Sequence, residues 1–241
     1  NFDKIMCGLS GFFSFKEVTN NSVAKATELS SLTSYRGPDH VGSFVDTRCV
    51  LIHNRLSIID LSDSSNQPMF YKNHVIIFNG EIFNYLELKE QLEKDLGVEF
   101  KTESDTEVLL VGLVYYGVDF LEKCNGMFAY AMYNTDKGRL HLGRDRFGIK
   151  PLYFKVSDNG IYFCSEQKPL AKVLGLELNN FQAEIYLQDV SYSDDFETYF
   201  DRLVALAPGC YAEIDRDVVV KTWYERPALK DKKLNIDHLE L

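Results

Sequence analysis

The sequence predicts an α+β fold with mostly antiparallel sheets. Segments that read as strands come in neighbouring runs joined by short turns, and short turns suit antiparallel pairing. Segments that read as helices come in groups and do not alternate regularly with the strands, which argues against a parallel α/β fold. The chain has 241 residues, of which 45% are hydrophobic and 13% aromatic, so it can bury a large core.

The first half of the chain is expected to form four strands and three helices. Ser22 is expected to cap the first helix, because it precedes a run of apolar residues at helical spacing. The third helix should begin at Asp105, because Ser104 and Glu107 have the spacing of a capping box. The expected ranges are 8–15, 41–45, 49–59 and 74–78 for the strands, and 23–32, 85–96 and 105–116 for the helices.

Six further strands and two helices are expected in the second half. A charged loop with Gly and Pro, "GRDRFGIKPLYF", separates two of these strands. The expected ranges are 127–133, 139–145, 152–155, 161–165, 210–215 and 218–223 for the strands, and 168–174 and 181–190 for the helices.

The net charge of −10 argues against nucleic acid or an anionic membrane as a partner, because both attract basic surfaces. No apolar run approaches the roughly 18 residues that span a bilayer. The five cysteines are scattered and odd in number, with no spacing that suggests zinc, so we expect no metal site. Reduced thiols of this kind favour a cytoplasmic protein over a disulfide-bonded one.

Cys7 follows Met6 and precedes an apolar strand, so it has two interpretations. A lone cysteine in such a strand is usually a small core residue. Alternatively, removal of an initiator Met6 would leave Cys7 as the first residue, with a thiol and a free amine together. An α-amine has a pKa of roughly 8, so it can act as a base near neutral pH.

Other residues could complete a site for an amino acid. Asn79 and Gly80 could donate two hydrogen bonds to one oxyanion, although Asn-Gly is also a dipeptide typical of a hairpin turn. Arg55 stands in an apolar strand, where its charge needs an anion such as a carboxylate. Asp105 could accept an ammonium group, or could simply be an acid favoured at the start of a helix.

These motifs resemble a known family when they are taken in order. "MCGLSGFF", "RGPDHVG", "NRLSIID", "FNGEIFNY", "ESDTEV", "GRDRFGIKPLYF", "SEQKPL" and "LAPGCY" follow the order seen in class II glutamine amidotransferases. The chain looks like the N-terminal glutaminase domain of glutamine-hydrolysing asparagine synthetases. The resemblance implies an N-terminal nucleophile hydrolase fold, in which two stacked antiparallel sheets lie between helices as a four-layer αββα sandwich.

The resemblance also implies hydrolysis of L-glutamine to glutamate and ammonia, with Cys7 as nucleophile and Asn79 and Gly80 holding the oxyanion. Arg55 would bind the glutamine carboxylate and Asp105 its ammonium. The residues expected to line the remaining pocket are Leu56, Ser57, Ile58, Ile59 and Glu81. The loop from Arg36 to Asp39 is expected near the site.

The family pattern predicts three parts of the chain. Residues 7–223 are expected to be the amidotransferase domain. Residues 224–241 are expected to be a linker into a synthetase domain, which would be the partner of this domain and is not in the given sequence. ATP and Mg²⁺ are expected only in that synthetase domain. The chain could also form a homodimer. Residues 1–6 are expected to be a cloning remnant, a wrongly assigned start or a leader. Two alternatives to an asparagine synthetase-type glutaminase are a non-catalytic module of the same fold and an amidotransferase that acts on a sugar acid or another carboxylate.

Overall fold

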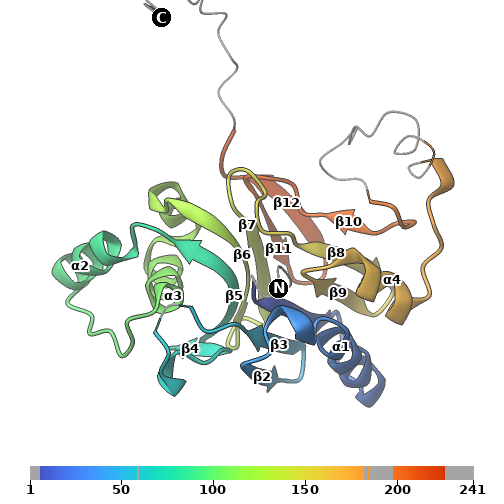
Figure 1. Ribbon diagram of the computed structural model, residues 1–241, viewed down its shortest axis with the longest axis horizontal. Coiled ribbons are helices and arrows are strands. Elements are labelled where there is room, and N and C mark those ends of the chain that lie inside the picture. Colours follow the sequence, from blue (N-terminus) through green and yellow to red (C-terminus); the bar gives the residue numbers. More distant parts are fainter. Residues whose placement is uncertain (1–5, 59, 182–183, 185–197, 226–241) are drawn as a thin grey trace, which may run out of the picture.

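The computed structural model describes residues 6–58, 60–181, 184 and 198–225, and these residues form two antiparallel sheets of six strands each (Figure 1). Sheet A has the strand order β10-β8-β9-β1-β3-β2, and sheet B has the order β12-β11-β7-β6-β5-β4. The strands of sheet A are β1 (Gly8–Ser14), β2 (His40–Val45), β3 (Cys49–Arg55), β8 (Tyr153–Ser157), β9 (Gly160–Cys164) and β10 (Val204–Ala205). Those of sheet B are β4 (Met69–Tyr71), β5 (His74–Ile82), β6 (Gly126–Asn134), β7 (Arg139–Arg144), β11 (Cys210–Ile214) and β12 (Val218–Thr222).

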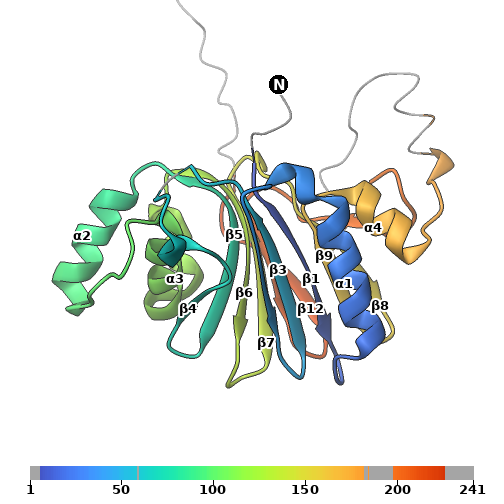
Figure 2. The same cartoon turned by 60° about the horizontal axis from the view of Figure 1, so that its bottom comes forward.

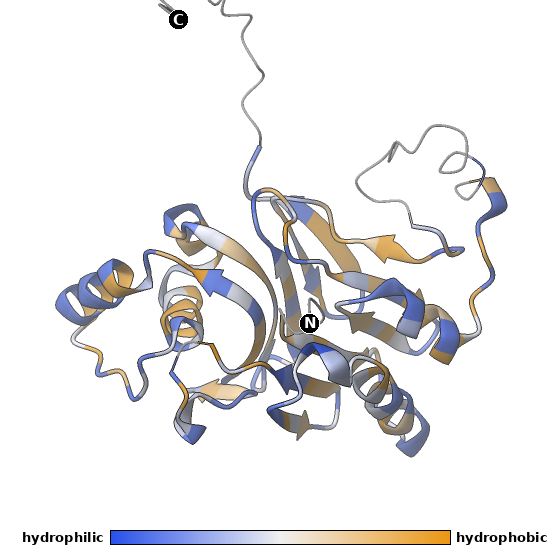
Figure 3. Ribbon diagram, viewed as in Figure 1, coloured by the Kyte–Doolittle hydropathy of each residue, from blue (hydrophilic) through white to orange (hydrophobic). Residues whose placement is uncertain are grey.

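Helices cover the outer face of each sheet, so the molecule has four layers (Figure 2). The α-helices are α1 (Asn20–Leu32), α2 (Tyr85–Leu96), α3 (Asp105–Tyr116) and α4 (Gln167–Leu174). α1 and α4 pack on sheet A, whereas α3 packs on β5 of sheet B and α2 packs on α3. Because α3 lies between sheet B and α2, its residues from Asp105 to Leu113 are all buried, while hydrophilic residues dominate α2 (Figure 3).

The side-chain alternation of the central strands builds two cores at once. In β1, Leu9 and Phe13 join the core between the sheets, whereas Phe12 joins the core beneath α1. In β3, Leu51 faces the inner core and Val50 faces the helices. Strands buried on both faces read as continuous apolar runs, and this explains the composition of β1 and β3. The predicted α+β, four-layer αββα sandwich is therefore confirmed.

Several local predictions were wrong. Asn79 and Gly80 do not form a turn but lie inside β5, paired with β6. β3 ends at Arg55 and does not extend to residue 59. Thr19 is the N-cap of α1, and Ser22 is the third helical residue of its capping box.

The start of α3 was predicted correctly, but the capping box was not. The Ser104 hydroxyl accepts from Thr106 N–H, whereas the Glu107 carboxylate accepts from the backbone N–H groups of Lys101 and Thr102. The sequence did not predict β4, β10 or the 3₁₀ helices Ser34–Arg36, Asp63–Ser65 and Gly117–Lys123. The expected helix at 181–190 and the linker beyond residue 225 lie mostly outside the described residues. Within the described ranges, every helix is too short or too polar to cross a bilayer.

Candidate active site

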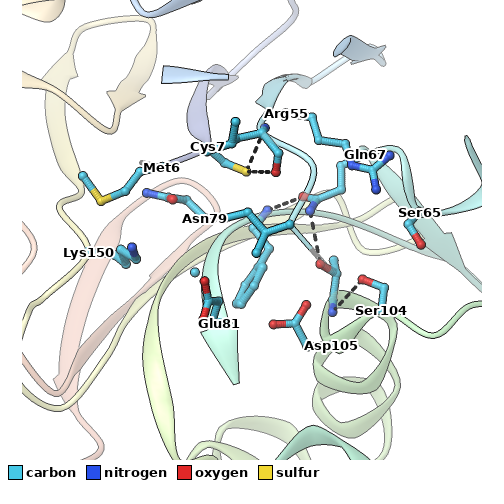
Figure 4. Close-up of a pocket in the computed structure, with 15 residues that line it drawn as sticks. Met6, Cys7, Arg55, Ser65, Gln67, Asn79, Glu81, Ser104, Asp105 and Lys150 are labelled. Carbon is cyan, nitrogen blue, oxygen red and sulfur yellow. Dashed lines mark hydrogen bonds between the residues drawn. The ribbon is translucent and has the colours of Figure 1, made fainter. Parts of the chain in front are cut away.

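One end of the sandwich gathers the predicted site residues around a shared pocket (Figure 4). Cys7 directly precedes β1, and Arg55 ends β3, which runs antiparallel beside it. Asn79 and Gly80 come from β5 of the other sheet, and Asp105 begins α3. Residues far apart in the sequence therefore meet in one pocket, which both sheets and the start of α3 line.

The Cys7 thiol faces the backbone that follows β3. Leu56 N–H donates to Sγ at 3.3 Å, and Sγ–H donates to the Leu56 carbonyl at 3.5 Å. Burial raises the pKa of Cys7, while the Leu56 hydrogen bond and the Arg55 charge oppose that rise. The Cys7 carbonyl accepts from Arg36 Nε at 3.0 Å.

Arg36 is itself fixed by an ion pair. Its Nη1 lies 2.8 Å from Glu166 Oε1, and the Tyr35 hydroxyl donates to the other oxygen of the same carboxylate. The loop predicted near the site also continues to Asp39, whose carboxylate accepts from Ser57 N–H at 2.8 Å. The carbonyl end of Cys7 is thus held by side chains from outside the pocket.

Asn79 presents an unused donor. Its side chain is only 1% exposed, and Nδ2 has no hydrogen-bond partner. Leaving a buried amide donor unpaired costs free energy, of order 1–3 kcal/mol. Such a group can donate to an oxyanion without first breaking another bond, because no protein acceptor competes for it.

Gly80 directs its backbone N–H to the edge of β5 that faces away from β6. Phe78 N–H donates to Gln67 Oε1 at 2.6 Å and Ile82 N–H donates to Asp105 Oδ2 at 3.0 Å, both at that edge. Because N–H groups of a strand alternate between its two edges, Gly80 N–H points the same way and toward the pocket that it lines. A side chain is excluded here, since a Cβ would lie 2.3 Å from the Met127 carbonyl oxygen.

The guanidinium of Arg55 lines the pocket and is held on its far side by a turn. Nη1 donates to the Ser62 carbonyl at 3.1 Å and to Asn66 Oδ1 at 2.6 Å, and Nη2 donates to the Asp60 carbonyl. These neutral acceptors orient the charge without neutralising it, so it stays available to an anion.

Asp105 is buried at the first turn of α3, with 4% of its surface exposed. Burial raises the pKa of Asp105 to about 6, and the nearby Glu81 charge acts in the same direction. Hydrogen bonds from the backbone of Ile82 and Thr106 partly oppose the rise. A cationic ligand would favour its charged form.

The other predicted pocket residues divide into three groups. Leu56, Ile58 and Glu81 line the pocket. Ser57 is not among the lining residues, and its N–H is bound to Asp39. Ile59 lies outside the described residues.

Two functional candidates were missed from the sequence. Gln67 lines the pocket and bridges Phe78 N–H and the Thr106 hydroxyl, which fixes the edge of β5 against α3. Lys150 also lines the pocket, and burial lowers its pKa while the Glu81 charge opposes this. The "GIKPL" loop contained Lys150, but nothing in the spacing indicated that it turns toward Cys7.

Met6 forms part of the pocket wall next to Cys7, and the cavity volume of the pocket is about 40 Å³. This is far below the roughly 300 Å³ and more of typical small-molecule sites. No group of three or more His, Cys, Asp or Glu side chains suited to a metal occurs among the residues that the structure describes.

Comparison with known proteins places the chain in a family. A family model of the glutamine amidotransferase domain matches residues 6–225. The chain belongs to that family. The asparagine synthetase [glutamine-hydrolyzing] 1 of Bacillus subtilis (strain 168) is 35% identical to the amidotransferase chain over 227 residues, which cover 91% of this chain and 35% of that protein. Asparagine synthetase B [glutamine-hydrolyzing] of Escherichia coli (strain K12) is 36% identical over 200 residues, covering 82% of this chain and 35% of its own length.

The chain thus spans about a third of the length of these curated relatives. A solved structure, glutamine phosphoribosylpyrophosphate (PRPP) amidotransferase from B. subtilis complexed with ADP and GMP, matches with a TM-score of 0.68 at 17% identity. That match covers 91% of this chain and 50% of the other. It confirms the predicted N-terminal nucleophile hydrolase type of fold.

Proposed function

We propose that this domain hydrolyses the side-chain amide of L-glutamine to glutamate and ammonia. The observation that carries the proposal is a thiol, Cys7, in one pocket with the unpaired Nδ2 of Asn79 and the N–H of Gly80. Family membership and the glutamine-hydrolysing relatives support the same reaction. Arg55 would bind the α-carboxylate and Asp105 the α-ammonium, so both charged groups of a free amino acid would meet an opposite charge.

The reaction would proceed through a thioester. The Cys7 sulfur attacks the amide carbon, its proton passes to the α-amine of Cys7, and the oxyanion accepts hydrogen bonds from Asn79 and Gly80. The C–N bond breaks as the nitrogen takes up the proton and leaves as ammonia. Water then cleaves the thioester to give glutamate and restore the thiol.

This mechanism requires that Cys7 be the first residue. When Met6 is attached, the nitrogen of Cys7 is an amide and cannot act as a base, and Met6 narrows the pocket. We therefore infer that residues 1–6 are absent from the active form.

Ammonia is a reactive product that a second domain would consume. We infer that this partner is a synthetase domain, which alone would use ATP and Mg²⁺ to activate an acceptor carboxylate. The apolar side chains of Phe83, Phe147 and Ile149 are exposed, and they give such a domain apolar surface to cover. The five free cysteines agree with a reducing, cytoplasmic environment, and a homodimer stays a prediction.

The test measures ammonia release by the chain starting at Cys7, from glutamine and, separately, from asparagine. Ammonia and glutamate should form from glutamine, whereas asparagine should release no ammonia. If glutamate does not form, and 6-diazo-5-oxo-L-norleucine, an electrophile shaped like glutamine, leaves Cys7 unmodified, the fold serves instead as a non-catalytic module. An amidotransferase for a sugar acid or another carboxylate would share this half-reaction and differ in the acceptor.

A further inference from the structure

Asp60 lies next to the pocket in a backbone conformation that is rare for residues with a side chain. Its φ is 50°, in the left-handed region. Aspartate tolerates this conformation better than most residues, because its short side chain bonds to nearby backbone groups. Asp60 does not line the pocket, so it can affect a bound molecule only through other residues.

The Asp60 carboxylate joins two separate segments. Oδ1 accepts from the backbone N–H of Ser62 at 3.0 Å and from its hydroxyl at 2.5 Å. Oδ2 accepts from the Ser65 hydroxyl at 2.6 Å and from Glu103 N–H at 2.9 Å. Hydrogen bonds from Ser62 and Ser65 hold the pKa of Asp60 below its usual range. Since Glu103 lies two residues before Asp105, the carboxylate ties the turn after β3 to the start of α3.

The same turn carries Arg55. The Asp60 carbonyl accepts from Nη2 of Arg55, and Nη1 donates to the Ser62 carbonyl and to Asn66. All three of these acceptors therefore belong to the turn that the Asp60 carboxylate closes. If that turn opens, Arg55 loses its support while Cys7, bound to Leu56, keeps its own.

We propose that Asp60 is a positioning residue that fixes Arg55 relative to Asp105, and so sets the affinity for the α-carboxylate and α-ammonium of the substrate. The inference rests on the proposed glutaminase function. It assigns Asp60 to recognition of the amino-acid end of the substrate and not to the chemistry at Cys7. An acceptor-only carboxylate is needed, because all four groups that it meets are donors.

The test compares Asp60→Asn and Asp60→Gly with the wild type, each with Cys7 as the first residue. Asn keeps the shape but replaces one acceptor oxygen with a donor, whereas Gly keeps the left-handed backbone and removes the carboxylate. Asp46→Asn is the matched control, because Asp46 is also a turn carboxylate, bound to Thr47 and located before the other end of β3. Both Asp60 variants should raise the KM for glutamine by about tenfold or more and change kcat by less than about threefold.

Labelling of Cys7 separates positioning from general damage. Iodoacetamide has no amino-acid end, and Cys7 is the accessible thiol, because the other four cysteines are buried. The rate at which iodoacetamide labels Cys7 should be the same in both Asp60 variants as in the wild type. By contrast, 6-diazo-5-oxo-L-norleucine at low concentration should label Cys7 about tenfold more slowly in the variants. If the wild type is active and both Asp60 variants keep its KM for glutamine, the positioning role of Asp60 is refuted while the proposed glutaminase function stands. The same holds if both reagents label Cys7 more slowly to an equal extent in the variants. A wild type that releases no glutamate overturns the proposed function and the inference with it.

Discussion

Replacing Asn79 with alanine should separate activity from stability. The side chain is buried, and its Nδ2 donor has no hydrogen-bond partner. Truncation therefore breaks no hydrogen bond made by that donor, and it relieves an unpaired group that costs of order 1–3 kcal/mol. The small cavity that remains acts in the opposite direction, so the free energy of unfolding should change by no more than about 1 kcal/mol.

The catalytic effect should be much larger. In the proposed reaction, Nδ2 of Asn79 would meet an oxyanion that forms only after Cys7 has attacked. Removal of one such donor typically raises the activation barrier by about 2.7–4 kcal/mol, which lowers kcat by about 10²–10³. The KM for glutamine should change little, because the interaction belongs to the transition state.

Asn134 provides the matched control on the neighbouring strand. Its Nδ2 donates to His74, and its Oδ1 accepts from the backbone of Asp136 and Lys137. Asn134→Ala should lower the free energy of unfolding by about 1–3 kcal/mol and leave kcat intact. Glutamate release and urea denaturation measure both quantities. An Asn79→Ala variant that loses stability as Asn134→Ala does, while keeping kcat within tenfold of the wild type, would refute the oxyanion role of Asn79.

Three further predictions use the same assays. Cys7→Ala should abolish glutamate release and leave the melting temperature nearly unchanged, and turnover that persists would disprove the nucleophile assignment. Arg55→Ala should mainly raise the KM for glutamine, by about tenfold or more, because a charged hydrogen-bond partner is lost; a fall in kcat alone would contradict this. Since burial raises the pKa of Asp105 to about 6, the carboxylate is lost as the pH falls through 6, and the KM should rise below that pH. Asp105→Asn should have a high KM that no longer depends on pH in this range. If the KM of this variant still rises as the pH falls, the pH dependence belongs to another group.

The Asn79-Gly80 segment shows why one strong local pattern was misleading. Asn-Gly favours turns when nothing else decides, because both residues tolerate left-handed backbone. Here β6 pairs with β5 along its whole length, from His74 opposite Asn134 to Ile82 opposite Gly126. That long-range pairing keeps Asn79 in extended backbone, and the dipeptide alone carries no sign of it.

Some residues of the site could be predicted from the sequence because of their chemistry. Cys7, Arg55 and Asp105 each stood out as a chemically costly or reactive group in an apolar or helix-terminal setting. The structure brings all three to one pocket. Gln67 and Lys150 could not be found in this way, because their roles depend on contacts across the fold and not on their neighbours in the sequence.

The electrostatics of the pocket indicate what the thiol still requires. Burial raises the pKa of Cys7 even though Arg55 and Lys150 lower it, so at neutral pH the thiol is mostly protonated. Asp105 is a nearby acid, but its Oδ2 accepts from Ile82 N–H, and in the proposed function its charge binds the ammonium of the substrate. In the proposed function the base is the α-amine of Cys7 itself, which would lie within reach of its own thiol once Met6 is removed. We infer that exposure of this amine turns a half-buried thiol into a nucleophile, since the same change also removes Met6 from the wall of the pocket.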